Sequence, residues 1–462
     1  MSGARHVGVI DIGKTNAKVA VVDLASEREV GVLTRPNTVL AGPPYPHFDI
    51  EGLWSFICRA LGELHREHTI DALSVTAHGA SGVLLAEGGD LAAPVIDYEF
   101  AGPDTLAQDY DAIRPDFAET GSPRLGMGLN VGAQLYWQFN SDPDLAARAH
   151  TFLTYPQYWS YRLSGVKANE VTSLGCHTDL WNPHENRFSS LVERLGLSGK
   201  MAPVQPANAC LGGVLPEVAE VTGLPLSTPV YCGLHDSNAS LFPHLLKGEA
   251  SFSVVSTGTW VIALAIGGKS VSLNPSRDTL VNVNAFGDPV PSARFMGGRE
   301  FDRLMHQAEP SCTDSEAESV IRRQIMLFPA IESQSGPFQG QAARWTIDEA
   351  ELRGGERFAA VSFYLALVTS EMLAMIDARG PVVVEGPFTR NPQFLQMLEA
   401  TTGRPVTTSK ASATGTSIGA ALLASGAGKD RHQGQRVSAT GKAPDPELET
   451  YAHLWRERVS ST

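Results

Sequence analysis

The sequence has few cysteines and lacks the motifs that usually give cysteine a structural role. Its 462 residues contain five cysteines, an odd number, widely spaced and without a C-x-x-C pair, which argues against a disulfide framework or a zinc site. The N-terminus lacks the long apolar stretch of a signal peptide, and no apolar run exceeds the length of a strand. We therefore expect a cytoplasmic protein with reduced thiols, no exported leader and no contact with a membrane.

Positive charge is also scarce. The chain has 36 Lys and Arg against 50 Asp and Glu, a formal net charge of −14. This balance argues against nucleic acid as a partner, because phosphate-backbone binding depends on Lys and Arg. A small anion is not excluded, since backbone N–H groups at a Gly-rich turn can hold phosphate. Neither the G-x-x-x-x-G-K-[ST] phosphate loop nor the G-x-G-x-x-G dinucleotide fingerprint occurs.

Two similar hairpin patterns are present. Residues 7–12 and 17–24 are rich in Val and Ile and flank a Gly-Lys-Thr-Asn turn, and residues 250–256 and 259–266 flank the turn Thr257-Gly258-Thr259. The repetition indicates an internal duplication into two related halves. Strand patterns alternate with helical ones, for example the apolar periodicity of 355–379, so an α/β architecture is predicted. The polar composition after Gly426 predicts a loose tail.

Two acidic residues stand where they could do chemistry. Asp11 lies at a strand end beside the first turn, where a carboxylate could hold Mg²⁺ next to phosphates, or could be an ordinary turn acid. Asp236 follows the apolar strand PVYCG and begins a helical pattern. It could be a general base for a hydroxyl proton, although from the residues alone a helix N-cap is the more common role of such an aspartate.

Four segments in order resemble the FGGY carbohydrate kinases, within the superfamily of actin, hexokinase and Hsp70-type ATPases. They are IDIGKTNAKVAVVD, GLHDSNASL, STGTW and EGPFTRNPQFLQMLEATTGRPV followed by GAALLA, together spanning roughly 6–425. The resemblance implies two ribonuclease-H-like α/β domains with an interdomain cleft. It places the sugar and the catalytic aspartate in domain 1–240 and the nucleotide in domain 241–427, followed by a polar tail over 428–462.

The resemblance also implies a role for individual residues, with ATP and Mg²⁺ as cofactors. Asp236 falls on the catalytic base and Asp11 on the acid near Mg²⁺. Residues expected to contact the nucleotide are Gly13, Lys14, Thr15, Asn16 and Lys18 in the first half, and Thr257, Gly258, Thr259, Gly386, Phe388 and Asn391 in the second. Two features depart from the family pattern: Lys14 replaces the usual Thr, and Pro387-Phe388 replaces glycines. Phe388 could stack on adenine or pack in the core.

The sugar contacts implied by the same resemblance follow the third strand. They are His78, Gly79, Tyr98, Glu99 and Asp236, with Trp54 or Phe100 as candidates to pack on an apolar sugar face. The pair His235-Asp236 is similar to that of rhamnulokinases and fuculokinases, which favours a 6-deoxyketohexose such as L-rhamnulose or L-fuculose. Xylulose, ribulose and polyols such as erythritol stay open.

Three other classes compete with a sugar kinase. A nucleotide- or sugar-binding regulator of the same fold is suggested by Pro387-Phe388 and opposed by Asp236. A chaperone-like or cytoskeletal ATPase needs an added peptide-binding domain or a filament surface, and we expect no room for such a domain. An oxidoreductase of the dinucleotide-binding type lacks its fingerprint. The resemblance leaves a homodimer open.

Overall fold

The computed structural model describes residues 4–247, 250–269, 271–306, 308, 310–408, 415–426 and 445–460. The chain forms two compact units, each built from three separate segments. The first unit comprises Met1–Gly248, Val281–Pro289 and Ala413–Gln433, and the second comprises Glu249–Leu280, Val290–Ser412 and Gly434–Thr462. The units therefore differ from a division at 240/241 and 427/428, because two later segments return to the first unit.

The first unit is built on a seven-stranded sheet. Its order is β11-β12-β6-β1-β2-β3, with β13 also paired to β6. The strand β1 is antiparallel to β2 and parallel to β6, β2 is antiparallel to β3, and β6 is parallel to β12. The strands are β1 (His6–Ile12), β2 (Asn16–Asp23), β3 (Arg28–Pro36), β6 (Ala72–Ala77), β11 (Cys210–Gly213), β12 (Pro229–Tyr231) and β13 (Leu234–His235).

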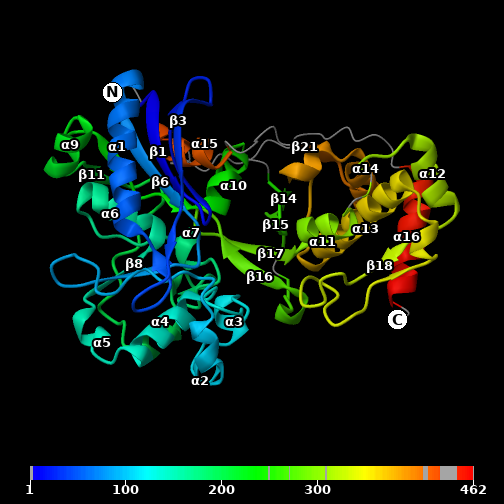
Figure 1. The fold of residues 1–462 in the computed structure, drawn as a ribbon, viewed down its shortest axis with the longest axis horizontal. Helices are drawn as coiled ribbons and strands as arrows, with labels where there is room; N and C mark the ends of the chain where they lie inside the picture. Colours follow the sequence, from blue (N-terminus) through cyan, green and yellow to red (C-terminus); the bar gives the residue numbers. More distant parts are fainter. Residues whose placement is uncertain are drawn as a thin grey trace. The chain divides into compact units, whose positions relative to one another are not determined.

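Both faces of this sheet are buried, and the alternation of strand side chains explains why the strands are so apolar. Ile10 and Ile12 of β1 pack in the core beneath α1 (Ile50–His68), whereas Val7 and Val9 pack in the core beneath α10 (Asp236–Leu246) and α15 (Gly415–Leu422). Figure 1 shows α1 lying along the blue strands of the sheet, with α15 behind them. Asp49 caps α1, where its carboxylate accepts from Gly52 N.

Shorter elements complete the first unit. Its other strands are β4 (Val39–Leu40), β5 (His47–Phe48), β7 (Gly82–Leu85), β8 (Thr151–Thr154), β9 (Trp181–Asn182) and β10 (Arg187–Phe188). Its other helices are α2 (Ala107–Asp111), α3 (Phe117–Thr120), α4 (Val131–Ser141), α5 (Leu145–Arg148), α6 (Tyr155–Ser164), α7 (Val171–Leu174), α8 (Ser190–Arg194) and α9 (Pro216–Thr222).

A second sheet repeats the strand senses of the first. Its order is β16-β17-β15-β14-β20-β21. The strand β14 is antiparallel to β15 and parallel to β20, β15 is antiparallel to β17, and β20 is parallel to β21. The series β3-β2-β1-β6-β12 thus corresponds to β17-β15-β14-β20-β21, as the duplication predicts. The strands are β14 (Phe252–Thr257), β15 (Val261–Ile266), β16 (Thr279–Val283), β17 (Pro289–Phe295), β20 (Val382–Glu385) and β21 (Val406–Thr408).

The helices of the second unit surround one long apolar helix, α13 (Gly354–Met375). The others are α11 (Gly297–Leu304), α12 (Asp314–Arg322), α14 (Pro392–Thr402) and α16 (Pro446–Ser460), with a small ribbon of β18 (Leu327–Phe328) and β19 (Arg344–Trp345). By length and composition α13 could cross a membrane, so the expectation of only strand-length apolar runs is wrong. Of its apolar stretch, 83% is buried within the structure, as for a core helix.

The end of the chain differs from the expected loose tail. Residues 427–444 lie outside the described residues, but α16 packs into the core of the second unit. Its buried side chains recur at helical spacing: Leu448, Tyr451, Ala452, Trp455 and Val459. Tyr451 and Trp455 also donate hydrogen bonds to the carbonyl oxygens of Ile325 and Leu327, at 2.6 and 2.7 Å.

The buried carboxyl group of Glu300 makes the second unit sensitive to pH. Glu300 is 1% exposed and accepts hydrogen bonds from Tyr364 Oη and Glu332 N. Burial raises the pKa of Glu300 to about 7 from 4.5. The folded chain therefore binds a proton that the unfolded chain releases between pH 4.5 and 7, so this group makes the free energy of unfolding fall as the pH rises through that window.

Glu300→Gln removes the titration while keeping the shape of the side chain. We expect the melting temperature of the variant to change less than that of the wild type between pH 5 and 7, with the difference greatest at pH 7. Thermal unfolding across this range measures the effect. A parallel pH dependence in the two proteins would contradict it.

Candidate active site

Asp236 lies where the chain leaves the first sheet. It is the first residue of α10 and follows β13, which is parallel to β6. The N-cap of α10 is His235, so Asp236 does not have the capping role that is otherwise common for such an aspartate. Its side chain is 33% exposed, and Ser237 donates to Oδ1 from its backbone N at 2.6 Å and from Oγ at 3.3 Å. The carboxyl group of Asp236 is thus partly exposed at the surface of the first unit.

The charge of Asp236 links two groups of predicted site residues. Burial has the largest effect on the pKa values of Asp11, His78 and Tyr98, and the charge of Asp236 shifts all three upward, against burial at His78. Asp11 is predicted to lie near Mg²⁺, and His78 and Tyr98 are predicted to contact the sugar. All four residues belong to the first unit. The folded chain therefore brings Asp11, His78, Tyr98 and Asp236 into one electrostatic neighbourhood, although they are far apart in the sequence.

Asp11 is paired across the first hairpin. It faces Lys18 in the register of β1 and β2, with Lys18 Nζ 3.5 Å from Asp11 Oδ2 and 3.0 Å from Glu29 Oε1. Burial raises the pKa of Asp11 to about 6, although Lys18 opposes the shift. The charge of Lys18 is thus already balanced by two carboxylates of its own sheet.

The hairpin turn itself presents two exposed polar side chains. Gly13 N donates to Asn16 O at 2.9 Å, and Asn37 Nδ2 donates to Gly13 O at 2.8 Å, which fixes the turn. Thr15 and Asn16 are exposed at its tip. Of the residues predicted for the first phosphate loop, these two keep side chains at the surface.

The side chain of Lys14 lies in an aromatic and acidic group. Its Nζ donates to Asp97 Oδ1 and lies 3.2 Å from Glu99 Oε2. The same ammonium stands over the rings of Phe48 and Tyr98, at 5.2 and 4.9 Å from their centroids. The structure thus associates Lys14 with the predicted sugar contacts Tyr98 and Glu99, whereas the family resemblance implies a contact with the nucleotide.

His78 is enclosed by the same aromatic group. Its ring centroid lies 5.1 Å from that of Phe48, 5.2 Å from Tyr98 and 4.8 Å from Tyr155. Burial lowers the pKa of His78 to about 4, so the ring is neutral near pH 7. Nδ1 lies 2.7 Å from Gly79 O and must carry the proton. Nε2 is then a buried acceptor without a partner among the described residues.

The second hairpin turn lies in the second unit. Gly258 and Thr259 are exposed at its tip. The hydroxyl of Thr257 is occupied within the protein, because it donates to Glu385 O at 2.5 Å and accepts from Phe388 N at 3.1 Å. Gly386 has φ of 83°, and a Cβ there would meet Thr257 O at 1.9 Å, so only glycine fits beside this strand end.

Phe388 and Asn391 have structural roles. Phe388 is 6% exposed, and its ring centroid lies 5.6 Å from Phe301 and 5.1 Å from Phe394. Of the two roles considered for it, the structure favours packing in the core. Asn391 caps α14, where Oδ1 accepts from Phe394 N at 3.0 Å and Nδ2 donates to Ser362 Oγ at 2.9 Å. Both atoms of its amide group thus make hydrogen bonds within the fold.

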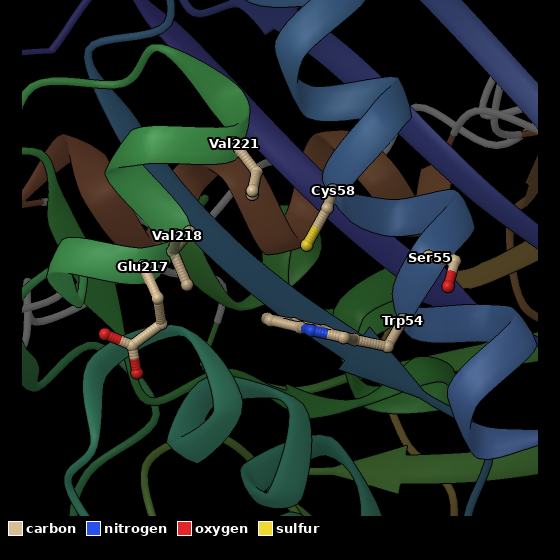
Figure 2. Close-up of a pocket in the computed structure, with 6 residues that line it drawn as sticks. All are labelled: Trp54, Ser55, Cys58, Glu217, Val218 and Val221. Atoms are coloured by element: carbon tan, nitrogen blue, oxygen red, sulfur yellow. The ribbon is translucent and has the colours of Figure 1, made fainter.

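A surface pocket of the first unit lies apart from these residues. Figure 2 shows Trp54 and Cys58 of α1 facing Val218 and Val221 of α9. Of the candidate residues named above, Trp54 lines it, and the predicted nucleotide, metal and catalytic residues do not. Trp54, considered above as a sugar platform, lies in this pocket under the guanidinium of Arg162, at 4.5 Å from the ring centroid. Phe100, the other candidate, packs against Tyr45 and Trp137.

The residues of the first unit could hold Mg²⁺ if the phosphate groups of a substrate supplied the other ligands. Within the described part of the chain, no cluster of three or more His, Cys, Asp or Glu could hold a metal alone. Mg²⁺ in phosphate-transferring sites is commonly held by one or two carboxylates together with substrate phosphates. Asp11 could supply one such carboxylate. Burial is the main cause of its raised pKa, and the charges of Asp236 and Glu29 add to it, so a cation beside Asp11 would stabilise its charged form.

The two sheets with matching strand senses, each with a polar hairpin turn, define a duplicated α/β fold. Residues 6–243 match the N-terminal domain of the FGGY family of carbohydrate kinases, and residues 249–433 match the C-terminal domain of carbohydrate kinase FGGY. The chain belongs to the FGGY family of carbohydrate kinases.

Individual relatives agree with this assignment. The structure of a carbohydrate kinase from Novosphingobium aromaticivorans is 36% identical, with a TM-score of 0.88, and the match covers 98% of this chain and 100% of that one. The xylulose kinase of Lactobacillus acidophilus shares the fold, at 16% identity and a TM-score of 0.79 over 99% and 98% of the two chains. An L-fuculokinase of Salmonella typhi is 27% identical over 56% of this chain, and the match spans 56% of that relative's length.

Proposed function

We propose that the protein is an ATP-dependent sugar kinase that phosphorylates a hydroxyl group of a ketose. The observation that carries the proposal is the position of Asp236. Its exposed carboxylate begins α10, and its charge acts both on Asp11 and on His78 and Tyr98. A base between a phosphate-binding hairpin and a polyol site is what transfer to a hydroxyl requires.

In the proposed reaction Asp236 accepts the proton of the sugar hydroxyl. The hydroxyl oxygen attacks the γ-phosphorus of ATP, a new P–O bond forms, and ADP leaves with the electron pair of the broken bond. Thr15 and Asn16 of the first turn, with Gly258 and Thr259 of the second, are exposed and suited to bind phosphate oxygens. Mg²⁺, when bound through Asp11, supplies charge neutralisation on those oxygens.

We further propose a 6-deoxyketohexose, L-rhamnulose or L-fuculose, as the substrate. His78 Nε2 is a buried acceptor that a sugar hydroxyl would satisfy. The ring of Tyr98 beside it is partly exposed and offers apolar surface suited to a methyl group. Relatives named L-fuculokinase and rhamnulokinase support this choice. A relative named probable L-xylulose kinase keeps other ketoses and polyols as the alternative.

A panel of ketoses and polyols with ATP and Mg²⁺, read as ADP formation, tests the proposal. We expect sugar-dependent turnover, with the highest kcat/KM for L-fuculose or L-rhamnulose. A higher kcat/KM for xylulose, ribulose or erythritol would contradict the proposed substrate but would still support the proposed kinase activity. Nucleotide or sugar binding without turnover on any sugar would favour a regulator of the same fold.

Lys14→Met tests whether Lys14 serves the sugar. The variant removes the ammonium between Phe48, Tyr98 and the two acids Asp97 and Glu99. Because Asp97 loses its partly buried partner, we expect the sugar site to loosen and the KM for sugar to rise about 10-fold, the effect of one charged contact. The KM for ATP should change by less than about 3-fold. Steady-state kinetics with each substrate varied would contradict the assignment if only the KM for ATP rose.

A further inference from the structure

Two buried residues beside Asp236 have no part in the reaction proposed above. His235 is 7% exposed and Cys176 is 5% exposed. One ring nitrogen of His235, Nε2, lies 3.2 Å from Asp236 Oδ1 and 3.6 Å from Cys176 Sγ. A carboxylate oxygen this close favours a proton on the ring, because a cationic imidazole is attracted to it and an unprotonated ring nitrogen is not.

The electrostatics support a proton on this ring. Burial lowers the pKa of His235, but Cys176 and Asp236 raise it more, to about 9. Burial in turn raises the pKa of Cys176, whereas His177 and His235 lower it to about 5. The lowered pKa favours a negative charge on the Cys176 thiol. That charge attracts the protonated imidazole and holds it in place.

The backbone around His235 is fixed by a buried network. Its N–H donates to Thr172 Oγ1 at 3.0 Å, and the Thr172 hydroxyl donates to Glu170 Oε2. Gly79 leaves just enough space for the ring, because a Cβ there would lie 2.9 Å from His235 Nε2 and 3.2 Å from Cys176 Sγ. The imidazole is thus enclosed on several sides and has little freedom to turn away from Asp236.

The contacts of Asp236 are unequal on its two oxygens. Oδ1 accepts from Ser237 N and Ser237 Oγ, and it lies 3.2 Å from His235 Nε2 in an ion pair. For Oδ2, the described residues provide no hydrogen-bond donor. Because these contacts are all on Oδ1, Oδ2 is the oxygen left to face a substrate.

We propose that His235, held by Cys176, is a positioning residue that binds Oδ1 of Asp236 and so directs Oδ2 to the substrate hydroxyl. This rests on the proposed sugar kinase function. In the reaction the hydroxyl O–H bond breaks, the proton forms a bond with Oδ2, and the oxygen's electron pair forms the new bond to phosphorus. His235 keeps its own proton throughout, so it orients the base without exchanging a proton with the substrate.

Three variants with wild type as reference test this role. His235→Leu keeps similar bulk and removes the donor, His235→Gln keeps an N–H near the position of Nε2, and Cys176→Ala removes the contact behind the ring. We expect kcat to fall about 10- to 100-fold in His235→Leu, the loss of one hydrogen bond to a charged group. The KM values for ATP and for sugar should change by less than about 3-fold, because binding contacts remain.

The conservative variant His235→Gln gives a sharper comparison with wild type than His235→Leu does. His235→Gln should restore kcat to within about 5-fold of wild type, and Cys176→Ala should lower it by about 3- to 10-fold, since the donor remains but the ring is less constrained. Thermal melting accompanies each variant. If His235→Leu does not fold, Cys176→Ala and His235→Gln still decide between the outcomes.

Several results would overturn the proposal. Equal losses of kcat in His235→Leu and His235→Gln would remove the role of the donor. An unchanged kcat in His235→Leu, or a change confined to KM, would also contradict the positioning role of His235. Neither result would contradict the proposed kinase function. Wild type without sugar-dependent turnover on any ketose or polyol would overturn both the function and the positioning role, and is thereby distinguished from a failure of His235 alone.

Discussion

Asp236→Asn should lower kcat about 10²- to 10⁴-fold, the usual contribution of a general base. The amide keeps the size of the side chain and an oxygen for Ser237 N to donate to, but it does not accept the proton of a sugar hydroxyl near neutral pH. The KM for ATP should change little. The measurement is ADP formation with the best sugar of the panel, at saturating concentrations of both substrates.

The control is a matched substitution away from the site. Asp109→Asn changes an exposed aspartate on α2, and we expect its kcat to equal that of wild type. Melting temperatures of both variants should lie close to the wild-type value, because neither side chain is in the core. Turnover by Asp236→Asn at the wild-type rate would remove Asp236 as the base.

Trp455→Ala should destabilise the second unit by about 3–5 kcal/mol, the cost of deleting a large buried aromatic side chain. Trp455 is 1% exposed. Its ring contacts Phe328 and Phe338, with centroids 6.4 and 5.9 Å away, and its Nε1 donates to Leu327 O at 2.7 Å. The substitution leaves a cavity and an unpaired carbonyl oxygen. Chemical unfolding followed by fluorescence and circular dichroism measures the change.

A substitution on the other face of α16 provides the control. His453 is 73% exposed, so His453→Ala should alter stability by less than about 0.5 kcal/mol. Trp455→Phe should give an intermediate loss, because it keeps one ring and removes the hydrogen bond. A loss below about 1 kcal/mol in Trp455→Ala would mean that α16 behaves as the loose tail expected from composition.

Local patterns in the sequence predict much of the fold. The alternating Val and Ile residues of 7–12 and 17–24 give β1 and β2, and the helical spacing of 355–379 gives α13. The two hairpins predict the duplication, which the matching strand senses confirm. The last helix was not predicted, because the expectation for this part of the chain was based on the polar composition after Gly426. The spacing of Leu448, Tyr451 and Trp455 was the available signal.

Local sequence patterns could not predict the directions in which the side chains of the site point. Whether Lys14 faces a phosphate or a sugar depends on Asp97 and Phe48, which approach it only through the tertiary fold. The occupied hydroxyl of Thr257 likewise depends on β20 lying parallel to β14. The placement of His235 beside Asp236 depends on a contact between His235 Nε2 and Cys176 Sγ. The sequence gives no reason to single out Cys176.

The segmented build of the first unit has a consequence for synthesis on the ribosome. Val7 and Val9 of β1 form one core with Ala420 and Ala421 of α15, and α15 emerges only after the strands β14 to β21 have been made. Until then this face of the nascent sheet has no cover from α15. Completion of the first unit must therefore wait for most of the chain, and a polypeptide ending near residue 247 should be prone to aggregation through that face.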